Sequence, residues 1–292
     1  MSDYKNGKWA KKIIDLQKDD GSWGYFHSLS LPTPQQPMTT EQAIGRLRLL
    51  GFTKDDAVIK KAISYMHDCL AEKNVTPDRR EKQGDWDVFM NLMLATWIRR
   101  FTCDDVLANE VAKKWHHIVE VSFSNGKYNP DAYINTLYDI MKPKCGIAKS
   151  KQFTRIDTYY PISLLVGEID ESIEKAYFDY IMNSETAYYY GVEGAITRLP
   201  NDFCSKEASR YLSAIEIYCE YPNKYCKEKL KFVVEWLNKN KNETGRWDMG
   251  ATVKDGKYFP LSDSWRTAEL RENDCTYRIE KIISALDNRG GQ

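Results

Sequence analysis

The sequence predicts an all-α protein, folded as one two-layered helical barrel over residues 1–292. Three observations predict it: apolar residues recur at helical spacing, two kinds of helix alternate, and a short motif returns along the chain. A length of 292 residues allows one large hydrophobic core or two smaller ones, so length alone does not choose between them. The repeat favours a single domain of about five to six helical hairpins.

Apolar side chains step by three or four residues, as they do along one face of a helix. Two such sets are Ile59, Ile63, Met66 and Leu70, and Ile279, Ile282 and Leu286. The boundary residues that we expect are Thr39 with Gln42 as a capping box, Thr53 and Asp170 as N-caps, Asn129 before Pro130 at a helix start, and Gly51 and Gly167 as stops. Alternating strand patterns do not occur, so helices account for the ordered structure.

The helices fall into two classes by their polar faces. Segments 88–98 and 208–219 are apolar nearly all round, whereas segments 54–70, 105–121 and 223–240 carry Lys and Glu on one side. A helix without a polar face must be buried, so inner and outer helices are expected. A two-layered barrel has this pattern, although a large orthogonal bundle would produce it too.

A Gly-x-aromatic motif follows an outer helix and precedes an inner one. Its copies are Gly21-Ser22-Trp23, Gly84-Asp85-Trp86, Gly126-Lys127-Tyr128 and Gly245-Arg246-Trp247, with a degenerate copy at 188–190. The intervals between copies suit one helical hairpin and its loops.

The first copy extends to Gln17-x-x-x-Gly21-x-Trp23, which resembles the QW motif of squalene and oxidosqualene cyclases. Lys241 to Trp247 matches only its Gly and Trp. The resemblance implies the α/α toroid shared by those cyclases and the β-subunits of protein prenyltransferases, with the motif stapling neighbouring repeats. It also implies an isoprenoid-like ligand in the bore of the barrel.

Composition excludes several classes of function. The 42 basic and 42 acidic residues balance and are interspersed, so a nucleic-acid partner gets no support. No stretch approaches a membrane span and the first residues lack a signal pattern, which predicts a cytoplasmic protein. The seven cysteines and four histidines show no metal-ligand spacing, so we expect no structural zinc, and any cofactor is unknown.

In such a barrel the N-termini of the inner helices would gather at one mouth. Their free N–H groups and partial positive charges would make a polar rim over an apolar bore, with Trp97, Tyr133, Tyr211 and Tyr218 as possible wall residues. Such a cavity suits a small apolar or amphipathic ligand. Trp97 and Tyr211 are our candidates for binding its apolar body.

Three groups of polar residues would lie on this rim. Asp274-Cys275-Thr276 resembles the Asp-Cys-Thr of oxidosqualene cyclases, in which the aspartic acid is the proton donor; Asp274 can instead be the N-cap of the last helix. Asp85 and Asp87 can act as acid and base or hold a metal and diphosphate, or can simply satisfy the first turn of a helix.

The third group is the loop that contains Asp263, Trp265, Arg266 and Arg271. Its arginines could bind phosphate or carboxylate, and the alternative is a salt-bridged surface loop.

These residues leave three hypotheses open. The first is an enzyme or former enzyme for an isoprenoid-like ligand, with Asp274, Asp87 or Asp85 as catalytic groups. The second is a non-catalytic helical scaffold or partner-binding module, whose protein partner is unknown. The third is a carbohydrate-active helical barrel that uses Asp85 or Asp87 together with Asp263.

Overall fold

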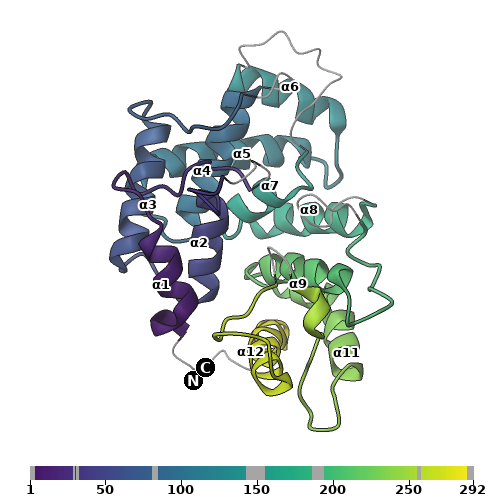
Figure 1. The fold of residues 1–292 in the computed structure, drawn as a ribbon. Helices are drawn as coiled ribbons and strands as arrows, with labels where there is room; N and C mark the ends of the chain where they lie inside the picture. The colour runs from purple at the N-terminus through teal and green to yellow at the C-terminus, as the bar shows by residue number, and fades with distance from the viewer. Residues whose placement is uncertain are drawn as a thin grey trace. The chain divides into compact units, whose positions relative to one another are not determined.

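In a computed structural model the described part of the chain is all-helical, as predicted. The structure describes residues 4–28, 30, 33–80, 85–142, 155–185, 194–254 and 258–287, and among these it contains helices and no strand (Figure 1). The helices are α1 (Lys8–Asp15), α2 (Thr40–Leu49), α3 (Ala57–Leu70), α4 (Trp86–Arg99), α5 (Val106–Ser122), α6 (Pro130–Met141), α7 (Tyr159–Leu164), α8 (Glu171–Asn183), α9 (Lys206–Tyr218), α10 (Lys224–Lys229), α11 (Lys231–Lys239) and α12 (Ala268–Leu286). Short 3-10 turns lie at Tyr4–Asn6 and Ala251–Val253.

The chain forms two compact units. Unit 1 contains Met1–Trp115 and Ile134–Thr154, and unit 2 contains His116–Tyr133 and Arg155–Gln292. The boundaries cut through α5 and α6. The single toroid domain expected over 1–292 stays a prediction.

Unit 1 is built on the pairing of α3 with α4, which lie side by side in Figure 1, and on the packing of α1 against α2. Helix α4 is the most apolar of these, with Phe89, Met90 and all residues from Leu92 to Ile98 buried. Gly45 in α2 lets the Trp97 ring approach closely, because a Cβ at Gly45 would lie 3.1 Å from that ring.

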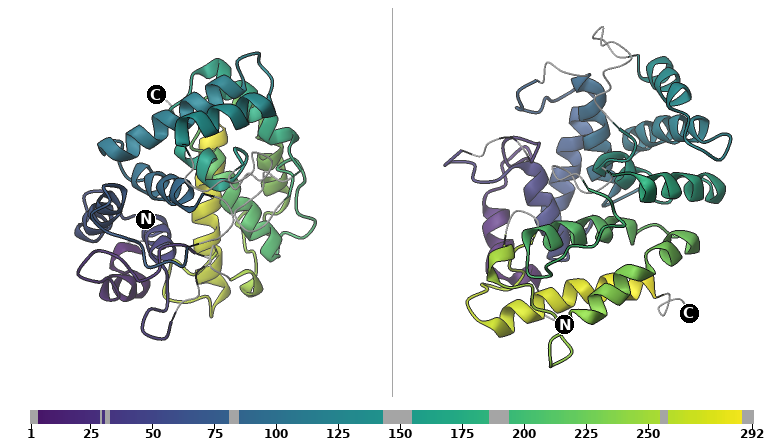
Figure 2. Two further views of the ribbon diagram at one scale, coloured as in Figure 1. Left: turned by 90° about the horizontal axis from the view of Figure 1, so that it is seen from above. Right: turned by 90° about the vertical axis from the view of Figure 1, so that its right-hand side faces the viewer.

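Unit 2 is organised around α9 and α12, shown in green and yellow in Figure 2. Helices α10 and α11 pack against α12, and α7 packs against α9. Residues Ala208, Ser209, Tyr211–Ile215, Ile217 and Tyr218 of α9 are buried, as its apolar sequence predicts.

Most predicted helix boundaries are confirmed. Thr39 and Gln42 form the capping box at the start of α2, and the Asn129 side chain accepts hydrogen bonds from the N–H groups of Asp131 and Ala132 at 3.0 Å. Gly51 and Gly167 have φ of +94° and +73° after their helices, as stop residues require.

Two boundary predictions are wrong. Thr53 does not cap α3, whose N-cap is Asp56; residues 53–56 form a turn in front of the helix instead. The segment 223–240 is not one helix, because α10 ends and α11 begins at the fully buried Leu230.

Candidate functional site

Trp23 joins the two helices that flank its loop. Its indole Nε1 donates to the carbonyl oxygen of Ile13 in α1 at 2.7 Å, and its backbone N–H donates to Oγ1 of Thr40 in α2 at 2.9 Å. The side chain is 1% exposed. This tryptophan therefore closes the end of one helix and positions the start of the next.

Gln17 and Gly21 attach the same loop to α3. The Gln17 Nε2 donates to the carbonyl oxygens of Gly21 at 3.0 Å and Val58 at 2.9 Å. Gly21 has φ of +92°, and a Cβ there would lie 2.3 Å from the carbonyl oxygen of Lys61. Only glycine fits this position, for reasons of both backbone conformation and space.

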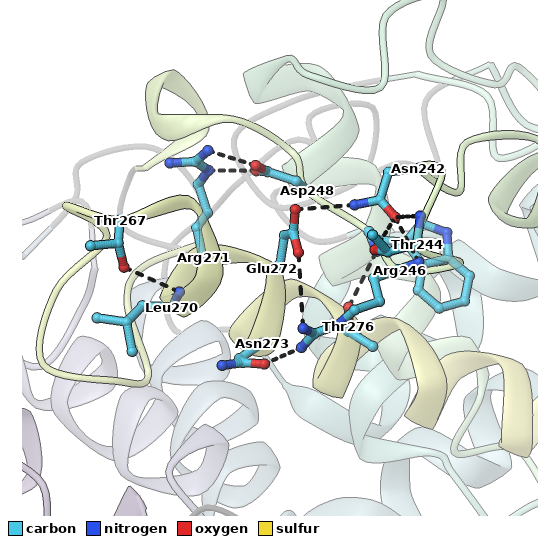
Figure 3. Close-up of polar contacts among 11 residues, drawn as sticks. Asn242, Thr244, Arg246, Asp248, Thr267, Leu270, Arg271, Glu272, Asn273 and Thr276 are labelled. Atoms are coloured by element: carbon cyan, nitrogen blue, oxygen red, sulfur yellow. Dashed lines mark hydrogen bonds and ion pairs between the residues drawn. The ribbon is translucent and has the colours of Figure 1, made fainter.

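The Gly245 loop of unit 2, part of which Figure 3 draws, repeats the bonds of Trp23 and of its turn but has Lys241 in place of Gln17. Trp247 Nε1 donates to the carbonyl of Leu237 at 2.7 Å, ten residues back as in the first loop, and its backbone N–H donates to Oγ1 of Thr276 in α12 at 3.2 Å. The turns also match: Lys18 N–H bonds to Ser22 and Gly21 N–H to Lys18, just as Asn242 bonds to Arg246 and Gly245 to Asn242.

The other copies of the motif are less complete. Gly126 has φ of +73° and its N–H donates to the Phe123 carbonyl at 2.7 Å, while the Tyr128 ring lies 4.3 Å from that of Tyr180. Trp86 is the first residue of α4. Gly84 and the degenerate copy at 188–190 lie outside the described residues.

Asp274 is buried in α12 and holds the loop in front of that helix. Its Oδ2 accepts hydrogen bonds from the N–H of Leu261 at 2.9 Å, the N–H and Oγ of Ser262 at 3.0 and 2.8 Å, and Nε1 of Trp265 at 2.8 Å. The structure therefore brings two predicted site residues, Asp274 and Trp265, into contact. The N-cap alternative for Asp274 is wrong, because Thr267 is the N-cap of α12.

The two residues after Asp274 fasten other segments to the same helix. Thr276 receives the Trp247 N–H, and a backbone hydrogen bond links the Cys275 sulfur to Met249. Burial raises the pKa of the Cys275 thiol to about 11, so this thiol is protonated at neutral pH. Asp274 thus binds the loop 261–265, while Cys275 and Thr276 both bind the segment 247–249.

Arg271 is held by an acid that the sequence analysis did not single out. Its guanidinium forms a two-pronged ion pair with Asp248, with Nη2 2.6 Å from Oδ2 (Figure 3). Burial raises the pKa of Asp248, but the hydrogen bonds from Arg271 and Gly250 and the charge of Arg271 outweigh it, so the pKa is lowered overall. Asp263 and Arg266 are exposed on the loop between Ser262 and Thr267.

An ion pair between a buried arginine and a half-buried glutamate lies two turns along α12 from the Arg271 contact. Arg278, 4% exposed, donates from Nε and Nη2 to both oxygens of Glu216 in α9 at 2.8 and 2.7 Å, and its guanidinium carbon lies 3.7 Å from the centre of the Tyr258 ring. Sequence reasoning missed this pair. The signal was a glutamate within the apolar helix 208–219, which needs a buried partner.

Asp85 and Asp87 occupy the start of α4. Asp85 is the N-cap, and its Oδ1 accepts from the N–H groups of Asp87 at 3.0 Å and Val88 at 3.1 Å. Asp87 forms an exposed ion pair with Arg80 at 2.6 Å. The helix-start alternative for Asp85 is thus what the structure shows. The pairing of either acid with Asp263, which belongs to the other unit, stays a prediction.

Trp97 and Tyr211, two of the four proposed wall residues, are buried and hydrogen-bonded. Trp97 donates from Nε1 to Oε1 of Glu41 at 2.9 Å, and Tyr211 donates from its hydroxyl to the carbonyl of Ile196 at 2.9 Å. Glu41, which is 4% exposed, also accepts from the Ser28 N–H at 2.8 Å. The sequence does not single out Glu41, because its partner Trp97 lies 56 residues away.

Within the described residues, no three His, Cys, Asp or Glu side chains come together as a metal site would require. Nor does any helix there have the length and apolarity needed to cross a membrane.

Comparisons of the chain with protein-family models, with curated proteins and with solved structures found no match.

Proposed function

We propose that this chain is a non-catalytic helical-repeat protein that acts by binding an amphipathic ligand with an apolar body and a polar head. The ligand that we propose is isoprenoid-like, as the QW resemblance implies. We do not propose that the protein catalyses a reaction on it.

One observation carries this proposal: each of the three candidate catalytic acids accepts hydrogen bonds or an ion pair from other groups of the same chain. A general acid must present a proton to its substrate. Asp274 instead receives four hydrogen bonds on one oxygen, Asp85 receives two from the first turn of α4, and Asp87 pairs with Arg80. These contacts account for each carboxylate without a reaction.

The matching loops support the type of fold. The Trp23 and Trp247 loops share an indole bond ten residues back and a backbone bond to a threonine of the following helix. Two such loops in one chain are what a repeated helical hairpin predicts.

The test begins with the protein purified from its own host. Native mass spectrometry and organic extraction would identify any retained molecule, and titration with geranylgeranyl diphosphate, followed by tryptophan fluorescence, would measure binding. We expect saturable binding and recovery of the probe unchanged. Glu269→Gln, a change of an exposed acid in the first turn of α12, is the matched control for Asp274→Asn.

Two results would overturn the proposal. A product that forms with the wild type and with Glu269→Gln but not with Asp274→Asn would show that the protein is an enzyme. The absence of both a retained molecule and saturable binding would leave a purely structural scaffold.

A further inference from the structure

Residues 71–80, which we call the strap, connect α3 to the segment before α4 and are exposed or half-exposed throughout. None of these ten residues is buried, and Val75 is 81% exposed. A segment without buried apolar side chains opens at low cost, because little surface changes its contact with water. Backbone N–H groups of residues 71–74 bond to carbonyls at the end of α3, and the side chains of Asp78 and Arg80 bind other parts of unit 1.

Asp78 fills a small anion-binding site in the loop before α2. Its carboxylate accepts hydrogen bonds from the N–H of Phe26 at 2.6 Å, the N–H of His27 at 2.9 Å and the Oγ of Ser30 at 2.7 Å. The two successive N–H groups bind the two oxygens of one carboxylate, an arrangement that prefers an anion, and the serine hydroxyl adds a third donor.

The same type of donor set occurs in unit 2, where it is permanently filled. There two successive N–H groups and a serine hydroxyl, from Leu261 and Ser262, bind the carboxylate of Asp274. Asp274 is 1% exposed and belongs to the middle of a long helix, so it cannot leave without breaking α12. Asp78 is half-exposed and lies on the strap, so it can leave when the strap opens.

The second contact of the strap is weak. Arg80 pairs with Asp87 at 2.6 Å, but their side chains are 60% and 37% exposed, and exposed ion pairs stabilise little. Beyond the anion site lie aromatic side chains: the His27 ring is 5.5 Å from that of Phe89, which is 5.8 Å from that of Trp86. An anionic head at Phe26 and His27 would therefore lie near the half-buried Trp86 and the buried rings of His27 and Phe89.

We propose that Asp78 occupies the place of a ligand's anionic group, and that the strap opens to let a phosphate or carboxylate bind the N–H groups of Phe26 and His27 and the Ser30 hydroxyl. The incoming anion accepts the same three hydrogen bonds that Asp78 accepts in this structure. This inference deepens the proposed function, on which it rests, by naming the polar head as an anion and giving its site.

The experiment measures amide hydrogen exchange at Phe26 and His27 and the rate of trypsin cleavage after Arg79 and Arg80. In the wild type, we expect millimolar inorganic pyrophosphate to speed cleavage severalfold, because it displaces Asp78. Asp78→Ala should raise both rates by roughly tenfold or more, and pyrophosphate should then restore the protection of the two amides. Sodium chloride at equal ionic strength should neither speed cleavage of the wild type nor protect the two amides of Asp78→Ala.

The controls separate this result from general damage. Asp19→Ala removes an exposed acid of unit 1 outside the strap and should leave both rates unchanged. Asp78→Asn keeps the shape of the side chain and one acceptor, so it should fall between the wild type and Asp78→Ala. Equal rates in the wild type and Asp78→Ala, or amides that do not respond to pyrophosphate in Asp78→Ala, would overturn the inference.

Comparing geranylgeranyl diphosphate with pyrophosphate shows whether the anion is a lipid head or a free anion. The same comparison separates failure of the proposed function from failure of the strap inference. If geranylgeranyl diphosphate protects the amides at lower concentration than pyrophosphate, the anion is the head of an amphipathic ligand. If only pyrophosphate protects them, the site binds a free anion, and the proposed function fails while the strap inference stands.

Discussion

Gly21→Ala should destabilise the protein far more than the same change at the equivalent glycine of the second loop. Both glycines have positive φ, +92° at Gly21 and +76° at Gly245. An alanine in the left-handed region costs about 1–2 kcal/mol at either position. The positions differ in their surroundings, because nothing lies within 4 Å of a Cβ at Gly245, whereas at Gly21 it would lie 2.3 Å from the Lys61 carbonyl oxygen.

At Gly21 a second cost in free energy arises, because an alanine Cβ would have to displace α3. A Cβ cannot approach a backbone oxygen to that distance, and neither the loop nor the helix backbone can rotate away as a side chain would. Overpacking of this kind costs about 1–3 kcal/mol. The total for Gly21→Ala is then about 2–5 kcal/mol, against about 1–2 kcal/mol for Gly245→Ala.

The assay is urea denaturation followed by circular dichroism. Gly51→Ala is the control within unit 1, since Gly51 has φ of +94° and open space around it. We expect Gly51→Ala and Gly245→Ala to lose similar free energy of unfolding and Gly21→Ala to lose clearly more. If all three agree within about 0.5 kcal/mol, the close approach of the Gly21 loop to α3 is refuted.

Three further changes test other contacts. Gln17→Leu should cost about 1–3 kcal/mol of unfolding free energy, because two carbonyl oxygens lose their donor, whereas Lys241→Leu, which removes a cation 4.8 Å from the Trp247 ring, should cost only about 0.5–1 kcal/mol; equal losses in urea denaturation would contradict the Gln17 contacts. Asp274→Asn should speed amide exchange at Leu261 and Ser262, and unchanged exchange would show that the carboxylate does not hold that loop. The lowered pKa of Asp248 means that its stabilising effect is present above its unfolded pKa of about 3.9 and is lost as the pH falls through the folded value. Asp248→Asn should therefore be less stable than the wild type at pH 7, and this difference should disappear once the pH falls below the folded pKa of Asp248, as measured by thermal denaturation from pH 7 into acid; a difference that persists there would rule out the ion pair as its source.

The fold class could be predicted because local patterns determine it. Apolar spacing and capping residues act within a few positions, and so the capping box at Thr39 and the start of α6 after Asn129 were both predictable. The start of α3 was not, because Asp56 is bound by Lys5 at 2.8 Å, a partner 51 residues away. Tertiary contacts of this kind override a local signal.

The candidate site could be predicted only in part, because its contacts also join residues that are distant in sequence. The choice of Asp274 and Trp265 identified two residues that do meet, but their roles depend on Leu261 and Ser262, whose backbone N–H groups carry no sequence signature. Asp78 was missed because it also binds backbone N–H groups, about fifty residues away. Backbone donors are present at nearly every residue, so a sequence does not reveal which of them an acid will find.

The indole hydrogen bonds of Trp23 and Trp247 each join residues only ten positions apart, which affects how the chain folds. Each indole bonds to a carbonyl of the helix just before it, Ile13 in one unit and Leu237 in the other. Closing so short a loop costs little chain entropy, and contacts of low sequence separation form fast. Each unit therefore contains a place where tertiary structure can form before distant segments meet, and we expect folding to begin separately around these two tryptophans.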